Sequence, residues 1–388
     1  MAAASQQATG TQAGRPQPQT TGQPDNVGPF VRHSRQSVRP GYSIAGQALG
    51  GTVDFPLSQA PGYLRFLDVT LNASGGTVGA GVLRPDSSAS QANELAFVQM
   101  KDSYGTVVFS GNGFEMGFLV MLYGGQAGVL SAADPTGWPS KTAIDAAGNG
   151  RYYFRIPFEI GGIGGYGCLA IGNAALQPAL HISINTSGSI FSTAPTTPAT
   201  ITITVDEAYY AVPVDVPSLE PPALGTTLQW LQMVCNPTVA SASSQRVQLP
   251  RLGGYLTTLI LEARDSSATP ARSDSIWPAT GANNRIRLYV DGVPVKDEQI
   301  DQRYNEMFVE FPNVTRPTGV VVYSFKNAEA QVVLGFLDSL EAAVATSPGS
   351  LVEVECTPWG TFASGPGVIT AIIGQIVPKG QVVYGLEG

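Results

Sequence analysis

Hydrophobic and polar positions alternate over short stretches of this chain, and the alternation predicts β-strands along most of its length. The clearest case is 67–72, where Leu67, Val69 and Leu71 alternate with polar residues, as in a strand with one buried face. Strands are expected in the first half at 52–57, 62–72, 95–100, 106–109, 118–123, 152–160, 180–185 and 201–205. Four prolines between 213 and 222 then interrupt the pattern, because helices and sheets both tolerate proline poorly.

A second series of strands begins near Thr226. These strands are expected at 246–249, 255–263, 285–290, 307–311, 319–325, 330–337, 351–356 and 368–377. The segment 296–307 is the one plausible helix, since Ile300, Tyr304 and Met307 follow one another at spacings of four and three. Each half holds about eight short strands, and a single sheet of that width would curl or split. Two packed antiparallel sheets per half are therefore favoured.

Parts of the second half repeat the first. The stretch 53–56 (VDFP), followed by 62–64 (GYL), resembles 247–250 (VQLP), followed by 254–256 (GYL). A second, ungapped match aligns 167–176 with 335–344. Both matches keep their order across the proline-rich break, so we infer a duplicated domain, since the period is too long for a solenoid unit.

These patterns predict an all-β fold with two tandem jelly rolls, each an eight-stranded antiparallel sandwich, behind a flexible N-terminal arm. The expected boundaries are 1–44 for the arm, 45–216 for the first roll, 217–225 for a proline-rich linker and 226–388 for the second roll with its C-terminal segment. The arm is inferred from 1–28, which are rich in Gln, Thr, Gly, Pro and Ala and lack apolar periodicity. Such a segment cannot offset its own ordering entropy.

Charge changes this picture in two ways. Charged residues form only 13% of the chain, about half of the usual share, which favours a surface covered by neighbouring subunits, because interface cores are depleted in charge. The net charge of -8 is also uneven, since residues 1–50 hold Arg15, Arg32, Arg35 and Arg39 against Asp25. A basic arm on an acidic body indicates an anionic partner, although a solvated tail is the alternative.

Candidate catalytic chemistry is sparse. The two histidines, His33 and His181, form no metal-binding pattern, and no GxSxG motif accompanies them, so neither metal hydrolysis nor a serine triad is favoured. Cys168, Cys235 and Cys356 are widely separated, which suggests buried free thiols in a reducing cytoplasm. We expect no cofactor. No secretory signal and no apolar run of roughly 18 residues is visible, so membrane attachment would be peripheral.

Two further features leave alternatives open. Glu353 and Glu355 share one face of a strand and could serve as the acid and nucleophile of a glycosidase, although a solvated or interface face is favoured. Trp138 and Trp277 each precede a proline in corresponding long loops. They could stack on sugars or pack the loop onto a neighbouring subunit, and we prefer the second interpretation.

Three stretches resemble the major capsid proteins of tectiviruses, which belong to the double jelly-roll lineage. The first runs from 152–157 (YYFRIP) to 180–185 (LHISIN) and is similar to the end of the first roll in that family. The second, 203–209 (ITVDEAY), is similar to the strand that closes roll one, and the third, 249–256 (LPRLGGYL), to the opening of roll two. The tandem order, total length and loose N-terminal arm also agree.

The resemblance implies a non-enzymatic shell subunit of a membrane-containing icosahedral phage, assembled as pseudo-hexagonal trimers. It implies an arm that faces the interior, where Arg32, Arg35 and Arg39 would meet lipid headgroups or membrane proteins. The expected partners are further copies of the chain, the internal lipid membrane and minor capsid or vertex proteins, with no specific nucleic-acid sequence. The expected location is the virion, after synthesis in the host cytoplasm. The alternatives are a double β-sandwich spike or carbohydrate-binding protein and, less favoured, a glycan hydrolase that uses Glu353 or Glu355.

Overall fold

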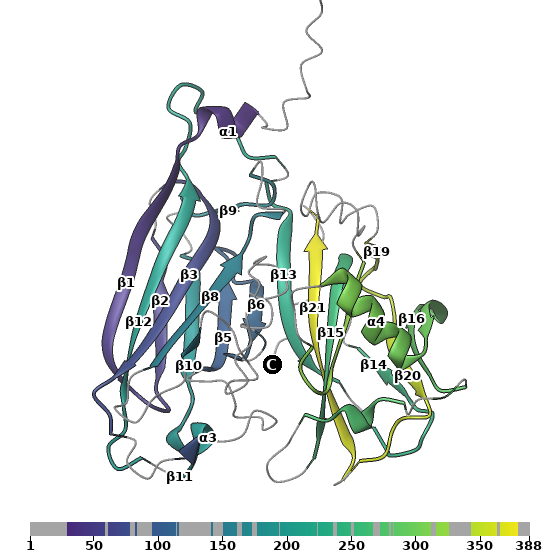
Figure 1. Ribbon diagram of the computed structural model, residues 1–388. Coiled ribbons are helices and arrows are strands. Elements are labelled where there is room, and N and C mark those ends of the chain that lie inside the picture. Colours follow the sequence, from purple (N-terminus) through teal and green to yellow (C-terminus); the bar gives the residue numbers. More distant parts are fainter. Residues whose placement is uncertain are drawn as a thin grey trace, which may run out of the picture.

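The first half of the chain forms two facing sheets in the computed structural model (Figure 1). One sheet has the order β1 (Gln36–Ala48), β12 (Thr200–Tyr210), β3 (Tyr63–Ser74), β8 (Gly150–Pro157) and β7 (Lys141–Thr142), with β9 (Leu169–Ala170) also paired to β3. The facing sheet has the order β2 (Thr52–Pro56), β10 (Ala179–Ile184), β5 (Leu95–Lys101) and β6 (Val107–Gly111). Smaller elements are α1 (Pro29–His33), α3 (Ser187–Ile190) and the paired β4 (Val82–Leu83) and β11 (Phe191–Thr193).

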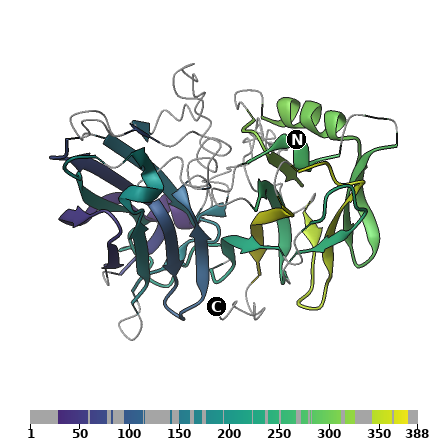
Figure 2. The same ribbon diagram turned by 90° about the horizontal axis from the view of Figure 1, so that it is seen from below.

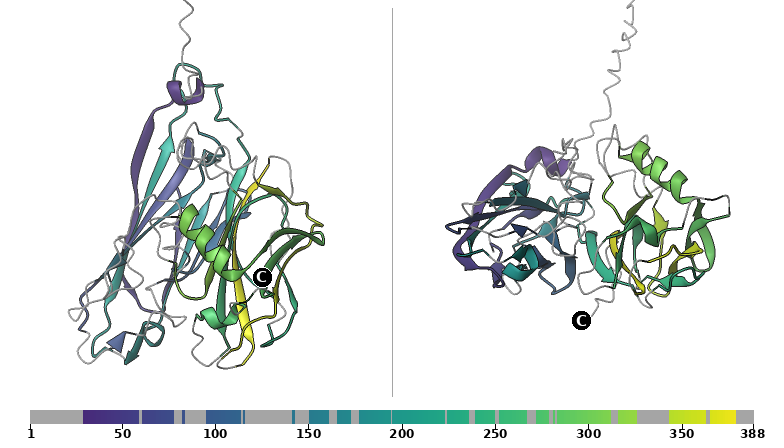
Figure 3. Two further views of the ribbon diagram at one scale, coloured as in Figure 1. Left: turned by 45° about the vertical axis from the view of Figure 1, so that its right-hand side comes forward. Right: turned by 60° about the horizontal axis from the view of Figure 1, so that its bottom comes forward.

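The second half repeats this plan. One sheet has the order β13 (Thr227–Val234), β21 (Gly367–Val377), β15 (Tyr255–Asp265) and β18 (Val320–Ser324), with β19 (Val344–Ala345) also paired to β15. The other has the order β14 (Arg246–Gln248), β20 (Val352–Thr357), β16 (Arg285–Val290) and β17 (Val293–Glu298). The helix α4 (Ile300–Glu310) and the 3-10 turn η2 (Asp274–Ile276) lie against this half (Figure 3).

The structure describes residues 29–58, 61–77, 82–83, 95–113, 115, 141–142, 150–160, 165–172, 177–193, 195–222, 224–235, 239–249, 252–266, 272–278, 281, 283–311, 316–325, 343–362 and 365–378. The expected strands at 118–123 and 330–337 lie outside these residues, as do 1–28 and Trp138.

Alternation of buried side chains explains why these segments are strands. Leu67, Val69 and Leu71 on β3 are buried, whereas the residues between them are partly exposed, so the strand packs one face on the core. Most of one core cluster lies in the first half, and a second cluster lies in the second half. The all-β fold with two tandem jelly rolls is therefore confirmed, and Figure 2 shows the two sandwiches side by side.

The two sandwiches are joined edge to edge. Strand β6, at the edge of the first roll, runs parallel to β13 of the second, with Trp230 opposite Phe109. This pairing makes one continuous nine-stranded sheet that crosses both rolls. Both aromatic residues are almost fully buried, so the junction is a packed interface that fixes one roll against the other.

The duplication is visible in the strand register. Strand β3 skips Arg65 in its pairing with β12, and β15 skips Thr257 at the corresponding point of its pairing with β21. In both halves this bulge lies just beyond a Tyr-Leu pair, Tyr63-Leu64 and Tyr255-Leu256. Because bulges are specific features of a strand pair, the same bulge in the same place supports a common origin for the two rolls.

Four expectations about the elements differ from the structure. The helix expected at 296–307 begins at Ile300, because 296–298 belong to the strand β17. Residues 36–44, assigned to the flexible arm, belong to β1, which hydrogen-bonds to β12; no position of β1 is fully buried, so the strand carries no clear apolar alternation. Residues 307–310, expected in a strand, end the helix α4, because helical spacing continues from Ile300 through Met307. The ungapped match of 167–176 to 335–344 is also wrong. Leu169 on β9 lies opposite Leu64 of β3, and Val344 on β19 lies opposite Leu256 at the equivalent place of β15. Position 169 therefore corresponds to 344, seven residues beyond the position 337 to which the match aligned it.

Candidate functional site

The segment before β1 is fastened to the first roll by one aromatic side chain. Phe30 on α1 is buried and packs edge-on against Tyr63 and Tyr210, with ring centroids 5.4 Å away in both cases. Leu219, from the expected linker, packs against the same small cluster. The proline-rich segment and α1 therefore lie together at one end of the first roll (Figure 3).

A buried carboxylate supports this end of the roll. Glu159 accepts hydrogen bonds from Arg65 at 2.8 Å, from the Gly165 amide at 2.8 Å and from the Tyr210 hydroxyl at 3.0 Å. Burial, reinforced by the negative charge of Glu159, raises the pKa of Tyr210 well above its ordinary value. Both carboxylate oxygens of Glu159 thus accept hydrogen bonds from residues near Phe30. This arrangement indicates a structural role for Glu159.

The three arginines proposed to face the interior differ in their surroundings. Arg32 and Arg35 are exposed, one in the last turn of α1 and one just before β1. Arg39 instead donates to Glu207 from Nε at 3.1 Å and from Nη2 at 2.6 Å and lies 4.7 Å from the centre of the Tyr209 ring. Glu207 also accepts from the Ser58 amide at 2.8 Å. Arg39 therefore neutralises a buried carboxylate of its own sheet.

The carboxylate pair considered for glycosidase chemistry lies together on β20. Arg246 approaches Glu353 at 3.4 Å and Glu355 at 3.5 Å, and the Tyr289 hydroxyl donates to Glu355 at 2.8 Å. The Arg246 guanidinium also stacks on the Tyr289 ring, 4.1 Å from its centroid. Both carboxylates are thus occupied by ion pairs and hydrogen bonds on the outer face of a sheet.

Sequence reasoning missed one constellation, because the register of β2 against β10 was not known. His181 lies directly opposite Asp54; its Nδ1 is 2.7 Å from Asp54, and its Nε2 is 3.1 Å from the Ser183 hydroxyl. The order of groups is that of a nucleophile triad. However, the Asp54 side chain is 77% exposed, and a solvated carboxylate orients and activates a histidine weakly.

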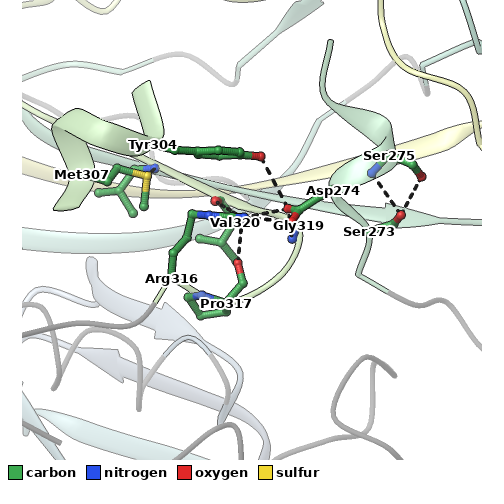
Figure 4. Close-up of polar contacts among 10 residues, drawn as sticks. Ser273, Asp274, Ser275, Tyr304, Met307, Arg316, Pro317, Gly319 and Val320 are labelled. Atoms are coloured by element: carbon green, nitrogen blue, oxygen red, sulfur yellow. Dashed lines mark hydrogen bonds and ion pairs between the residues drawn. The ribbon is translucent and has the colours of Figure 1, made fainter. Parts of the chain in front are cut away.

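An ion pair fastens α4 to the second roll (Figure 4). Asp274 on η2 accepts two bonds from Arg316, at 2.7 and 2.8 Å, and one from the Gly319 amide at 2.7 Å. Arg316 stacks on Tyr304 of α4 at 3.8 Å. Burial alone would raise the pKa of Asp274, but the bonds from Arg316 and Gly319 hold the pKa below its usual value.

The tryptophan that was expected in an exposed loop is part of the core. Trp277 is buried and its ring centre lies 6.1 Å from that of Trp359. The expectation that Trp277 contacts a sugar or a neighbouring subunit is therefore wrong, because the loop folds back over its own roll. The three cysteines are buried and free, and burial raises the pKa of Cys235 to about 12.

A second buried polar cluster lies at the junction of the rolls. Glu115 of the first roll accepts from the Asn112 amide at 2.8 Å and from the Gln232 amide group on β13 at 2.9 Å. Burial raises the pKa of Glu115 well above its usual value, and the charge of Glu262 on β15 raises it further. Arg264 donates to Glu262 at 2.6 Å and lowers the pKa of Glu115 in part.

Within the described ranges, no group of three or more His, Cys, Asp or Glu side chains is placed to hold a metal ion. Among the same residues, no helix combines the length and apolar character needed to cross a membrane. The carboxylates of Glu159, Glu207 and Asp274 are each engaged by partners within the chain.

Comparison with known proteins identifies solved structures that have a similar fold. No protein-family model and no curated protein matches the chain. Solved structures do match, among them a chain of Sulfolobus Turreted Icosahedral Virus (15% identity, TM-score 0.58, covering 88% of this chain and 91% of that chain). PBCV-1 VP54, fitted into a reconstruction of the virophage Sputnik, matches at 11% identity and TM-score 0.57, over 89% of this chain and 94% of that one.

The major capsid protein P2 of Bacteriophage PM2 also matches, at 11% identity and TM-score 0.51, over 90% of this chain and 99% of that chain. Because so few residues are identical, the likeness to these proteins lies in the fold, a pair of jelly rolls. The chain therefore has the double jelly-roll fold found in viral major capsid proteins.

Proposed function

We propose that this protein is the major capsid protein of a membrane-containing icosahedral phage and that it assembles as pseudo-hexagonal trimers. The observation that carries the proposal is the pair of equivalent rolls, placed side by side and joined edge to edge through β6 and β13. Three such chains supply six similar units around one axis, which suits a hexagonal tile. The fold is also that of major capsid proteins over nearly the whole chain.

The low charge of the chain supports the same function. Only 13% of the residues are charged. Many charged side chains of the described residues form ion pairs within the chain, such as Arg39 with Glu207. A shell subunit has extensive lateral contacts, and such interfaces are depleted in charged residues. The subunit would act in the virion after synthesis in the host cytoplasm, and the buried free cysteines suit that reducing compartment.

The proposed partners are further copies of the chain, the internal membrane and minor capsid or vertex proteins. Arg32 and Arg35 support the membrane contact, because they are exposed at the end of the roll where the N-terminal segment enters. Arg39 is a weaker candidate, because its guanidinium is engaged by Glu207.

The native mass of the purified protein, measured by light scattering and followed by electron microscopy, tests the proposal. We expect three times 40.5 kDa and particles with a roughly hexagonal outline. A stable monomer that never assembles would contradict it and favour a carbohydrate-binding or spike protein.

A further inference from the structure

We infer that β17 of one copy packs beside β1 of the next copy, with Val293 meeting Val38, in the way that β6 packs beside β13 within one chain. This inference rests on the proposed function and names the surface through which the copies meet. It follows from the equivalence of the two rolls, which assigns each strand edge of one roll a counterpart in the other.

The first counterpart is found across the sheets that contain the bulge. Ala208 lies opposite Phe66 at the bulge of the first roll, and Gly374 lies opposite Thr258 at the bulge of the second. On their other side, Ala208 faces Val38 on β1, and Gly374 faces Trp230 on β13. Val38 therefore occupies the place in the first roll that Trp230 occupies in the second.

The second counterpart is found across the facing sheets, by following hydrogen-bonded neighbours from strand to strand. In the first roll the row is Phe55, Leu180, Met100 and Phe109. In the second roll the row is Leu249, Val352, Val290 and Val293. The rows begin at Phe55 and Leu249, which the sequence repeat aligns, so Val293 occupies the place of Phe109.

Burial then distinguishes the two pairs. Trp230 and Phe109 face each other inside the chain and are 2% and 1% exposed. Their counterparts Val38 and Val293 are 66% and 62% exposed. Apolar side chains at the two positions where the fold already makes an interface, both left uncovered by the described residues, indicate an interface with another molecule.

The partner is a second copy of this chain, because the free edge of β17 and the free edge of β1 together reproduce a junction that the chain already contains. No described strand pairs with the outer edge of β1 or of β17. Figure 1 places β1 at one side of the molecule and the sheet of β16 and β20 at the other. One copy can thus offer each edge to a different neighbour, and such head-to-tail contacts close into rings when the rotation permits.

The contact between copies differs from the internal junction in one respect. Inside the chain, the backbone N–H of Gln232 donates to the Ser110 hydroxyl at 3.2 Å. The equivalent residues, which neighbour the paired positions in register, are Pro40 and Pro294. Proline cannot donate a backbone hydrogen bond and protects strand edges from uncontrolled pairing, so the contact between copies rests on side-chain packing.

Disulfide trapping tests the inference on the full-length chain. In the double variant Val38→Cys/Val293→Cys, mild oxidation should link most chains into covalent dimers and trimers, visible on a non-reducing gel and removed by reductant. The native cysteines are buried, so their contribution is low. The matched control is Val38→Cys/Val309→Cys, because Val309 is also exposed but lies on α4, and it should give no ladder.

The native mass of each variant before oxidation separates the two proposals. A trimeric mass without a 38–293 crosslink would overturn the β17–β1 contact and leave the capsid proposal standing. A monomeric mass without a crosslink would overturn both. As a second measurement, Val38→Asp should reduce the native mass from three chains to one while the circular dichroism spectrum is kept, whereas Val309→Asp should keep the parental mass; a trimeric Val38→Asp would also overturn the contact.

Discussion

At the residue scale, several buried or half-buried charged side chains of the described residues are paired within the chain. Arg39 shows why residue type alone was a poor guide to function. Its position among other arginines near the N-terminus predicted an exposed, anion-binding role, yet its guanidinium neutralises Glu207, which is 1% exposed. Nothing in the sequence places 39 beside 207, because only the register of β1 against β12 brings them together.

Replacing Arg39 by methionine should therefore destabilise the subunit. Loss of one partner leaves a buried carboxylate without its counter-charge, which costs about 2–3 kcal/mol for a pair whose arginine is partly solvated. Urea unfolding of the variant and the parent measures the difference. The control Arg35→Ser should change the unfolding free energy by less than about 0.5 kcal/mol, as exposed substitutions usually do; equal losses in both variants would contradict the assignment.

The bond between Asp274 and Arg316 predicts a pH dependence. Because the pKa of Asp274 is lower in the folded chain than its ordinary value, its contribution to stability is present above the unfolded pKa and is lost as the pH falls through the folded pKa. Arg316→Met should remove about 1–2 kcal/mol at pH 7, a range already reduced for solvent screening. The difference from the parent should shrink in unfolding experiments below pH 3, and a constant difference would argue against the ion pair.

At the element scale, the sequence predicted several strands that carry buried apolar side chains and missed or misassigned others. The expected strand 285–290 coincides with β16, and 368–377 differs from β21 by one residue. Strand β1 escaped notice because none of its positions is fully buried, and 307–310 were misassigned because Phe308 and Val309 are exposed apolar residues on a helix. The apolar residues at 308 and 309 lie on the surface of the helix. The sequence pattern alone cannot tell such exposed apolar residues from buried core residues.

Beside the junction of β6 and β13 lies a buried carboxyl that the sequence could not single out. Glu115 lies in the first roll, but its pKa is raised by burial and by Glu262 of the second roll. A carboxyl whose folded pKa exceeds its unfolded pKa destabilises the chain as the pH rises from the unfolded value through the folded one. Glu115→Gln should therefore make the urea midpoint less dependent on pH above the ordinary pKa of a glutamate side chain, and an unchanged pH profile would rule out this role.

At the scale of the whole molecule, duplication explains more than any single site. The two rolls share strand order, a bulge and an edge-to-edge junction, and sequence similarity between them survives mainly around 53–64 and 247–256. Tandem order was predictable from that repeat, because strands and turns are local properties. The use of β6 and β13 as a junction was not, because it depends on which strand ends at the edge of each sheet.

The whole molecule also has a preferred side for an anionic surface, if Arg32 and Arg35 act as proposed at the end where the N-terminal segment enters the first roll. Each arginine near an anionic membrane contributes about 1 kcal/mol, so Arg32→Ser/Arg35→Ser should weaken binding of the purified protein to phosphatidylserine vesicles by roughly 30-fold at low salt. Arg151→Ser removes an exposed arginine from β8 and should leave binding nearly unchanged. Equal binding by the parent, the double variant and Arg151→Ser in a vesicle flotation assay would remove the membrane contact from the proposed function. The proposal of a capsid protein would still stand, since neither Arg32 nor Arg35 belongs to the β17–β1 contact.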